Sequence, residues 1–335
     1  MLLVAIPVRR VRGAPVAQAR SSGALIAAVK GWRMTARATL TGTALPGLLE
    51  RLGFRPEDAA DLLTCLDALD AADWTQVDHL HALLADRVGR LDERPNPLEG
   101  QRTDHPVAPD LLALAALVAT GPLVHDELVR RGLPSRVAWA SASDLGQQVH
   151  IHRVVHGRFG LGSTGWVAPN YAGGLVWLGR LQYTLEKDEE FGWVLGCHIP
   201  ESGPLTPAAV DASLRLARDL AVPAFGDFPL SRVVCASWLL DRNLADRLDP
   251  ASNFVRFSRR FTPYGTPRDG RRDALFFGFH RETAGGQQVE LTALPRDTSL
   301  HRAILAQLDA GGVVAQPGWL PFPAEEQPFT ASMNS

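Results

Sequence analysis

The stretch His198-Ile-Pro-Glu-Ser-Gly-Pro-Leu-Thr-Pro207 decides how the second half of the chain is interpreted. Two apolar runs precede it. Residues 175–185 alternate apolar and polar side chains, and residues 191–199 follow an acidic turn, which predicts a hairpin. Residues 207–220 carry apolar side chains at helical spacing. A strand that delivers a histidine and a carboxylate to the turn before a helix suits chemistry, because strand ends fix side chains and helix N-termini attract anions.

Short patterned runs continue toward the C-terminus. The further predicted helices cover residues 241–248 and 298–309. The further predicted strands cover residues 232–237, 254–261, 274–281 and 288–294. This order of strands and helices indicates an α+β domain with a mixed sheet, and we expect the strand over residues 191–199 near the centre of that sheet.

The first half of the chain is predicted to be helical. Leucines recur at three- and four-residue spacing between residues 45 and 91, and further helices are predicted over residues 109–118, 122–132 and 134–156. The pattern changes near Gly173, so we predict a helical domain over residues 34–172 and a sheet domain over residues 173–322. Residues 1–33 are predicted to be a disordered extension, with Met34 as an alternative start, and residues 323–335 a flexible tail.

Composition narrows the class of protein. The 335 residues include 34 basic and 36 acidic side chains, which gives no electrostatic reason to expect nucleic acid as a partner. Three scattered cysteines predict neither a disulfide framework nor a zinc site, and they indicate a reducing cytoplasm. The N-terminal charges follow the apolar residues, the reverse of a secretory signal, so export and membrane insertion are not expected. We expect a cytoplasmic protein that handles small molecules.

Several phrases in the second half together resemble a bacterial, largely actinobacterial, family of two-domain acyltransferases. This family has a helical N-terminal acyltransferase domain and a GNAT-like C-terminal domain. The phrases are Leu178-Gly-Arg-Leu-Gln-Tyr183, His198 to Leu205, Ser237-Trp-Leu-Leu-Asp241, Asn253-Phe-Val-Arg-Phe257 with Arg259-Arg-Phe261, and Thr298-Ser-Leu300 through Gly318-Trp-Leu320. The resemblance implies transfer of an acyl group from an acyl thioester, either acyl-CoA or acyl carrier protein, to an amine of a small metabolite.

The resemblance also implies where the donor binds. In GNAT enzymes the strand equivalent to residues 191–199 ends beside the thioester, and the following turn presents N–H groups to the CoA pyrophosphate. Here the turn lacks the usual glycine pattern, and Pro204 and Pro207 remove two N–H donors, so a donor other than CoA stays open. The candidate donor-binding residues are Ser202, Gly203, Leu205, Thr206, Ser237, Asn253, Arg256 and Arg260. Arg256 and Arg260 are predicted to share one strand face, where a fork of guanidinium groups can hold phosphate.

Three residues are candidates for the catalytic groups. His198 or Glu201 would act as the base, and Tyr264 is a candidate acid. Each residue also has a purely structural interpretation. His198 could be a buried histidine, Glu201 a carboxylate that stabilises a helix N-terminus, and Tyr264 a surface residue of a loop. No metal is expected, because no third ligand accompanies His152 and His156. A non-catalytic GNAT-like binding or regulatory module and, more distantly, a hydrolase that uses Cys197 or Cys235 remain as alternatives.

Overall fold

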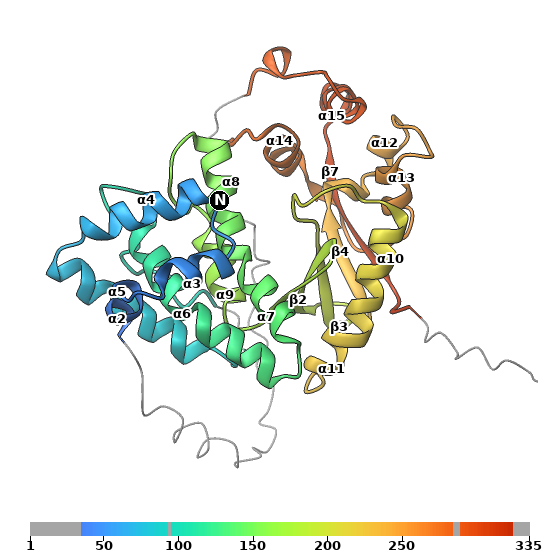
Figure 1. Cartoon of the computed structure of the whole chain (residues 1–335). Coiled ribbons are helices and arrows are strands. Elements are labelled where there is room, and N and C mark those ends of the chain that lie inside the picture. Colours follow the sequence, from blue (N-terminus) through green and yellow to red (C-terminus); the bar gives the residue numbers. More distant parts are fainter. Residues whose placement is uncertain (1–34, 93–94, 284–288, 324–335) are drawn as a thin grey trace, which may run out of the picture. The chain divides into compact units, whose positions relative to one another are not determined.

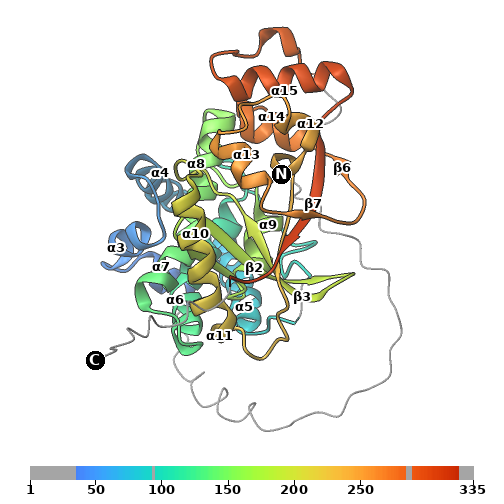
Figure 2. The same ribbon diagram turned by 90° about the vertical axis from the view of Figure 1, so that its right-hand side faces the viewer.

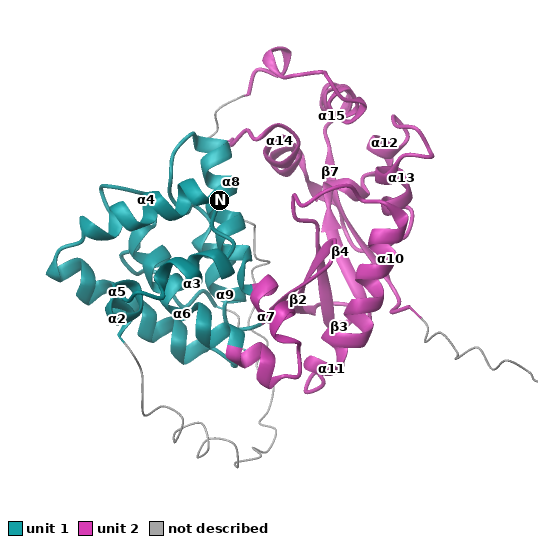
Figure 3. Ribbon diagram, viewed as in Figure 1, with its two compact units in different colours: residues 1–125, 142–173 teal, residues 126–141, 174–335 magenta. Residues whose placement is uncertain are grey.

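The computed structural model describes residues 35–92, 95–283 and 289–323 (Figure 1, Figure 2). The predicted extension over residues 1–33 lies outside these residues, as does the predicted tail over residues 323–335 except for its first residue. The chain divides into two compact units (Figure 3). One unit comprises residues 1–125 and 142–173, and the other comprises residues 126–141 and 174–335.

The first unit is built from helices. They are α2 (Ala36–Leu40), α3 (Leu45–Arg51), α4 (Pro56–Asp67), α5 (Ala71–Arg87), most of α6 (Leu111–Arg130), α8 (Asp144–His156) and α9 (Thr164–Asn170). Every residue from 111 to 119 of α6 is buried, so this helix forms the core although its length and hydropathy would also suffice to cross a bilayer. The prediction of two helices over residues 109–118 and 122–132 is wrong, because α6 continues through Pro122.

A buried ion pair fastens α8 to α4. Arg153 Nε donates to Asp58 Oδ1 at 2.6 Å, and the Asp58 side chain is completely buried. The other end of the same guanidinium binds Asp61 at 2.5 Å. Close backbone packing adds to this, because a Cβ at Gly146 would stand 2.2 Å from the carbonyl carbon of Gly53. An ion pair and close backbone packing therefore both hold α8 in place within this unit.

The second unit contains a mixed sheet. Its strands are β1 (Leu175–Leu178), β2 (Leu181–Asp188), β3 (Gly192–His198), β4 (Val233–Ser237), β5 (Thr262–Pro263), β6 (Arg268–Asp269) and β7 (Val314–Leu320). The order is β1-β2-β3-β4-β7-β5, and β6 pairs with β7. The predicted α+β class and the near-central position of β3 are confirmed. The predicted strand over residues 175–185 is two strands, because Gly179 adopts a φ of +69° and the chain turns between β1 and β2.

The second unit also contains helices, four of which form a hydrophobic core of their own. Helix α10 (Pro207–Leu216) begins at the N-cap Thr206, runs into a π-helical turn and ends in α11 (Val222–Ala224). Helix α7 (Ser135–Ala142) precedes the sheet in the chain. After β4 come α12 (Arg242–Ala245), α13 (Asn253–Ser258), α14 (Arg271–Phe279) and α15 (Ser299–Ala310). These four helices share a hydrophobic cluster that includes Leu244, Val255, Leu275 and Ile304.

Three strand predictions are wrong. Residues 254–261 lie mostly in α13, which starts at the Ser252 cap, and residues 274–281 lie mostly in α14. The described part of residues 288–294 contains a short 3-10 helix at Leu291–Ala293. Conversely, β7 was not predicted, although it joins β4 to β5. The predicted helix over residues 298–309 is confirmed as α15.

Candidate active site

Thr184, Glu186 and His198 form a hydrogen-bonded cluster on one face of the β2–β3 ladder. Gln182 pairs with His198 and Thr184 pairs with Gly196, so the even-numbered residues of both strands point to the same side. Thr184 Oγ1 lies 2.7 Å from His198 Nε2 and donates a 2.5 Å hydrogen bond to Glu186 Oε1. His198 Nε2 also lies 3.4 Å from this carboxylate oxygen. We call these three residues the histidine cluster.

Gly196 makes room for the carboxylate of the histidine cluster. A Cβ at this position would stand 2.4 Å from Cδ and Oε1 of Glu186. No side chain can occupy that space while Glu186 stays in place. The absence of a side chain in β3 thus lets a carboxylate from β2 lie across the neighbouring strand and reach His198.

The hydrogen bonds imply a tautomer for His198. An ionised Glu186 only accepts hydrogen bonds, so the Thr184 hydroxyl gives it its single proton. Thr184 Oγ1 then accepts from His198, which places the imidazole proton on Nε2 and leaves the lone pair on Nδ1. The His198 side chain is 28% exposed and that of Glu186 is 34% exposed. The cluster is therefore open to a reactant and has a histidine nitrogen that can accept a proton.

The strands β3 and β4 part beside His198. They are parallel, and their ladder consists of two pairs that end at Gly196 and Val234. Both strands continue beyond these pairs, to His198 on β3 and to Ser237 on β4. Within the described residues no ladder joins them over this last part. The histidine cluster thus lies at the point where the sheet separates.

The opposite face of β3 is packed and apolar. Cys197 pairs with Tyr183 and is buried, as is Cys235 on β4. A hydrogen bond with the Cys235 thiol, together with burial, raises the pKa of Cys197 well above its usual value. Because a nucleophilic cysteine needs a thiolate, Cys197 is a core residue here, and the hydrolase alternative gains no support.

The turn after β3 carries the predicted donor contacts. Ser202 and Gly203 are exposed, Leu205 is partly buried, and Gly203 has a φ of +124°. The Thr206 side chain accepts a hydrogen bond from Ala209 N and caps α10. The Thr206 hydroxyl is therefore engaged in capping the helix, whereas the exposed residues before it remain accessible to a ligand.

Arg180 lies against the same turn. One guanidinium nitrogen donates to the carbonyl oxygen of Pro200 at 2.8 Å and lies 3.5 Å from Ser202 Oγ. Burial lowers the pKa of Arg180, and its Nε has no hydrogen-bond partner among the described residues. Arg180 was not among the predicted donor-binding residues, so the structure adds a cation to the predicted donor site.

Glu201, the other candidate base, binds His280. Its Oε2 lies 3.0 Å from Nε2 of His280, the C-cap of α14, and its side chain is 59% exposed. It is also outside α10, whose first turn begins after Thr206. The carboxylate that accompanies His198 is that of Glu186, which was not among the predicted site residues.

Tyr264 binds β2 just beyond the histidine cluster. Its hydroxyl donates to Asp188 Oδ2 at 2.7 Å, and Asp188 lies two positions after Glu186 on the same face of β2. Burial and the bond to Asp188 raise the pKa of Tyr264, and the charge of Glu186 adds to this shift, so the hydroxyl holds its proton firmly. The structure thus pairs the Tyr264 hydroxyl with Asp188.

The remaining predicted donor-binding residues are dispersed. Ser237 caps the 3-10 helix Trp238–Leu240 by accepting from Leu239 N, and Asn253 is the first residue of α13. The predicted strand face with two arginines does not exist, because Arg256 is exposed on a helix. Arg260 forms an ion pair with Asp211 and contacts the Pro207 carbonyl, both on α10. Arg260 therefore fastens α13 to the start of α10.

Known domain families match both halves of the chain. The model of the N-acyltransferase N-terminal domain matches residues 43–173, and that of the GNAT-like C-terminal domain matches residues 175–320. The chain belongs to the family of two-domain N-acyltransferases that these domains define. It is an acyl-transfer enzyme of the GNAT-like type, as the resemblance implied.

Solved structures agree with this assignment. An acyltransferase crystallised with decanoyl-CoA and teicoplanin is 30% identical to the chain, with a TM-score of 0.73. An acyltransferase in complex with CoA and 10C-teicoplanin is also 30% identical, with a TM-score of 0.72. Each match covers 84% of this chain and 88% of the other. No curated protein sequence matches the chain.

Proposed function

We propose that the enzyme transfers an acyl group from acyl-CoA to an amine of a small-molecule acceptor, with His198 as the base. The observation that carries this proposal is the histidine cluster at the point where β3 and β4 separate. Similar acyltransferases crystallised with decanoyl-CoA, octanoyl-CoA and CoA support CoA thioesters as donors. The teicoplanin bound in one of these structures supports a bulky small molecule, such as a glycopeptide, as the acceptor.

The proposed reaction moves one proton in two steps. The acceptor amine attacks the thioester carbonyl, a C–N bond forms, and the proton of the amine passes to Nδ1 of His198. The positive charge that develops on the imidazole is stabilised by Glu186, directly and through Thr184. The C–S bond then breaks, and the proton goes to the leaving thiolate, so that an amide and free CoA are released.

The arrangement also suggests how the donor is held. Arg180 and the Pro200–Ser202 turn lie at the end of β3, where the phosphates of the donor would cross. A cation at this place compensates for the N–H donors that Pro204 and Pro207 lack. We also propose that the enzyme works in the cytoplasm, where acyl-CoA is available, without nucleic acid or a membrane as partner.

The test is release of CoA thiol by the full chain. Purified protein should bind octanoyl-CoA and decanoyl-CoA and should release thiol in the presence of an amine panel that includes a glycopeptide aglycone. His198→Ala should lower kcat at least 100-fold and leave donor affinity nearly unchanged, because a base acts in the transition state. Turnover only with acyl carrier protein would refute CoA as the donor.

The departure of the donor turn from the usual glycine pattern favours one alternative, a module that binds CoA without turnover. Tight binding of all CoA compounds with no thiol release, and no effect of His198→Ala on function in cells, would support that alternative and refute the proposed catalysis.

A further inference from the structure

Helices α4 and α8 of the first unit lie side by side and meet through polar side chains (Figure 1, Figure 2). Gln147, His150 and Arg153 of α8 are three residues apart, so they share one face of the helix. Arg55, just before α4, donates to Gln147 Oε1 at 2.9 Å, and Arg153 donates to Asp58 Oδ1 at 2.6 Å. His150 therefore lies between two polar links that join the helices.

His150 and two acidic residues of α4 form a cluster of possible metal ligands. One ligand atom each of Glu57, Asp58 and His150 lies within 4.8 Å of the others. We call these three residues the α4–α8 cluster. Asp58 is buried, His150 is partly buried and Glu57 is exposed, so the cluster reaches from the helix contact to the solvent. His152 and His156, which drew attention in the sequence, stack on each other with ring centroids 4.4 Å apart and do not belong to it.

Two buried polar atoms of the α4–α8 cluster lack a hydrogen-bond partner among the described residues. They are Oδ2 of Asp58 and Nδ1 of His150. Buried polar atoms nearly always have a partner, and where the protein does not supply it, an ordered water or an ion does. A carboxylate oxygen and an imidazole nitrogen are both ligands of zinc and related transition-metal ions. One divalent cation can therefore satisfy both atoms.

The place of the acidic residues in α4 does not by itself explain the cluster. Glu57 and Asp58 are in the first turn of α4, where the helix dipole favours carboxylates. Such a carboxylate normally accepts from the free N–H groups of that turn, but in the described structure Asp58 Oδ2 accepts from none. Oδ1 binds the guanidinium of Arg153, whose other end binds Asp61. Two carboxylates thus share the charge of Arg153, and Oδ2 is left for a second cation.

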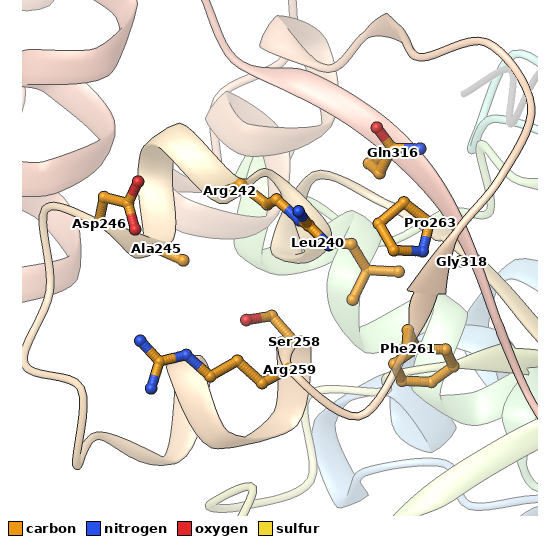
Figure 4. Close-up of a pocket in the computed structure, with 10 residues that line it drawn as sticks. All are labelled: Leu240, Arg242, Ala245, Asp246, Ser258, Arg259, Phe261, Pro263, Gln316 and Gly318. Atoms are coloured by element: carbon orange, nitrogen blue, oxygen red, sulfur yellow. The ribbon is translucent and has the colours of Figure 1, made fainter.

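The pocket of the second unit has a different lining. It measures about 360 Å³ and lies between α12, α13 and β7 (Figure 4). Arg242 and Arg259 bring positive charge to it, and Asp246 is its single carboxylate. Its lining contains neither histidine nor cysteine. Among the described residues, the ligand set for a transition metal is thus a feature of α4 and α8.

We propose that the α4–α8 cluster binds a divalent transition-metal ion such as Zn²⁺, with Asp58 Oδ2, His150 Nδ1 and the Glu57 carboxylate as ligands. The ion joins α4 to α8 beside the two polar links and leaves one coordination position to water. Arg153 orients the Asp58 carboxylate through its other oxygen, as partners of metal ligands commonly do. The role of the ion is to stabilise the helical unit, and the inference is independent of the proposed donor, acceptor and base.

Metal binding by the full chain, purified without an affinity tag and treated with EDTA, tests the proposal. Calorimetry should show one tight site for Zn²⁺, and Co²⁺ bound in its place should give a visible absorption spectrum that Zn²⁺ abolishes. His150→Ala should weaken Zn²⁺ binding at least 100-fold, since even residues that only orient a ligand contribute about 10- to 100-fold. Glu57→Gln should weaken it about tenfold. The matched controls are His156→Ala on α8 and Glu50→Gln on α3, which change exposed side chains outside the cluster and should leave the affinity unchanged.

Thermal unfolding gives a second readout, because an ion that binds only the folded chain raises the thermal midpoint. The midpoint of the unmodified protein should rise with Zn²⁺ and fall back with EDTA, whereas that of His150→Ala should respond to neither. A midpoint of His150→Ala in EDTA close to that of the unmodified protein in EDTA shows that the variant is folded. If His150→Ala does not fold, Glu57→Gln decides, because its side chain is exposed.

Three results would overturn the proposal. Equal Zn²⁺ affinity of the unmodified protein, His150→Ala and Glu57→Gln would place the ion elsewhere on the chain. No binding of Zn²⁺ or Co²⁺ would mean that the two buried atoms share an ordered water instead. Binding of Mg²⁺ or Ca²⁺ as tight as that of Zn²⁺ would contradict the imidazole as a ligand, because these ions prefer oxygen.

Discussion

The carboxylate of Glu186 occupies the place where a side chain at Gly196 would begin. The two residues come from neighbouring strands, and a Cβ at position 196 would stand 2.4 Å from Oε1 of Glu186. The carboxylate reaches the Nε2 side of His198 only because this glycine leaves the surface of β3 open. The proposed base therefore depends on a residue with no side chain.

Gly196→Ala should displace Glu186 and lower kcat while donor affinity stays nearly constant. The backbone of Gly196 is in a strand and not at a positive φ, so alanine is tolerated by the backbone itself. We expect a 10- to 100-fold loss of kcat in steady-state thiol-release kinetics, since an orienting group contributes less than the base. The double variant Gly196→Ala/Glu186→Asp, with a shorter acidic side chain, should recover part of the loss. An unchanged kcat in Gly196→Ala would contradict the role of Glu186.

Glu186→Gln and Glu201→Gln should have very different effects on kcat. Glu186→Gln removes the charge that stabilises the positive charge on His198 in the transition state, so kcat should fall at least tenfold. Glu201→Gln removes an exposed partner of His280, and such pairs contribute about 0–1 kcal/mol. Its kcat and thermal midpoint should stay close to those of the unmodified enzyme. The reverse order of effects would return the catalytic role to Glu201.

Arg153→Ala should destabilise the first unit strongly. It leaves the completely buried Asp58 without its cation, and breaking such a pair costs about 3–5 kcal/mol. The matched control is Arg90→Ala, because Arg90 pairs with Asp86 four residues earlier and both side chains are 48% exposed. That change should cost less than about 1 kcal/mol in urea unfolding. If the two substitutions lowered the unfolding free energy equally, burial of Asp58 would not be the cause of the loss.

His152 should make the protein less stable in acid. Burial, and next the neighbouring His156, lowers the pKa of His152 to about 4 in the folded state from its ordinary 6.5. The unfolded chain therefore takes up the proton first as pH falls, so stability is lost between pH 6.5 and 4, by about 3 kcal/mol for a shift of this size.

Urea unfolding at pH 7.5 and pH 5 tests this prediction. His152→Leu removes the titrating group and should reduce the pH dependence of the unfolding free energy, whereas substitution of the exposed His79 by Gln should not. A slope that is unchanged in His152→Leu would assign the acid sensitivity to other residues.

The spacing of apolar side chains predicted the helical half and the β2–β3 hairpin. It failed where the same residues fit both the helical spacing and the alternation of a strand. Phe254, Phe257 and Phe261 are three and four residues apart, as in a helix, while the intervening arginines imitate strand alternation. The Ser252 cap, which accepts from Val255 N, is the signal that decides for a helix.

Strand β7 was missed for a different reason. Its sequence contains Pro317 and Gly318, which normally interrupt strands. Gly318 is required there by the close approach of Phe261 and Leu240. Tertiary packing of this kind leaves little trace in local sequence.

The candidate site was predicted in part. His198 at a strand end follows from the sequence, because an apolar run leads into a proline-containing turn. Its partner Glu186 is twelve residues away and is set by the register of the hairpin. The sequence contains a signal for it: a tight turn between Asp188 and Gly192 fixes the pairing of Thr184 with Gly196. The pairing of Glu201 with His280, by contrast, joins segments 79 residues apart, and local pattern does not reveal it.

The separation of β3 and β4 has a consequence for tolerance to mutation. Peptide N–H and C=O groups on the inner edges of both strands lack a ladder partner beyond Gly196 and Val234 in the described part of the sheet. Any guest with amide groups of its own can complete the sheet there by main-chain hydrogen bonds, which depend on no particular side chain. The N–H of Leu195 bonds to Arg232 O on the β4 side, so that of Cys197, two residues on, faces the same side. We therefore expect the amide proton of Cys197 to exchange with solvent more slowly once a ligand with a pantetheine arm is bound. The side chains along these two strand ends can then change during evolution without loss of ligand binding, provided that the backbone path of the strands is kept.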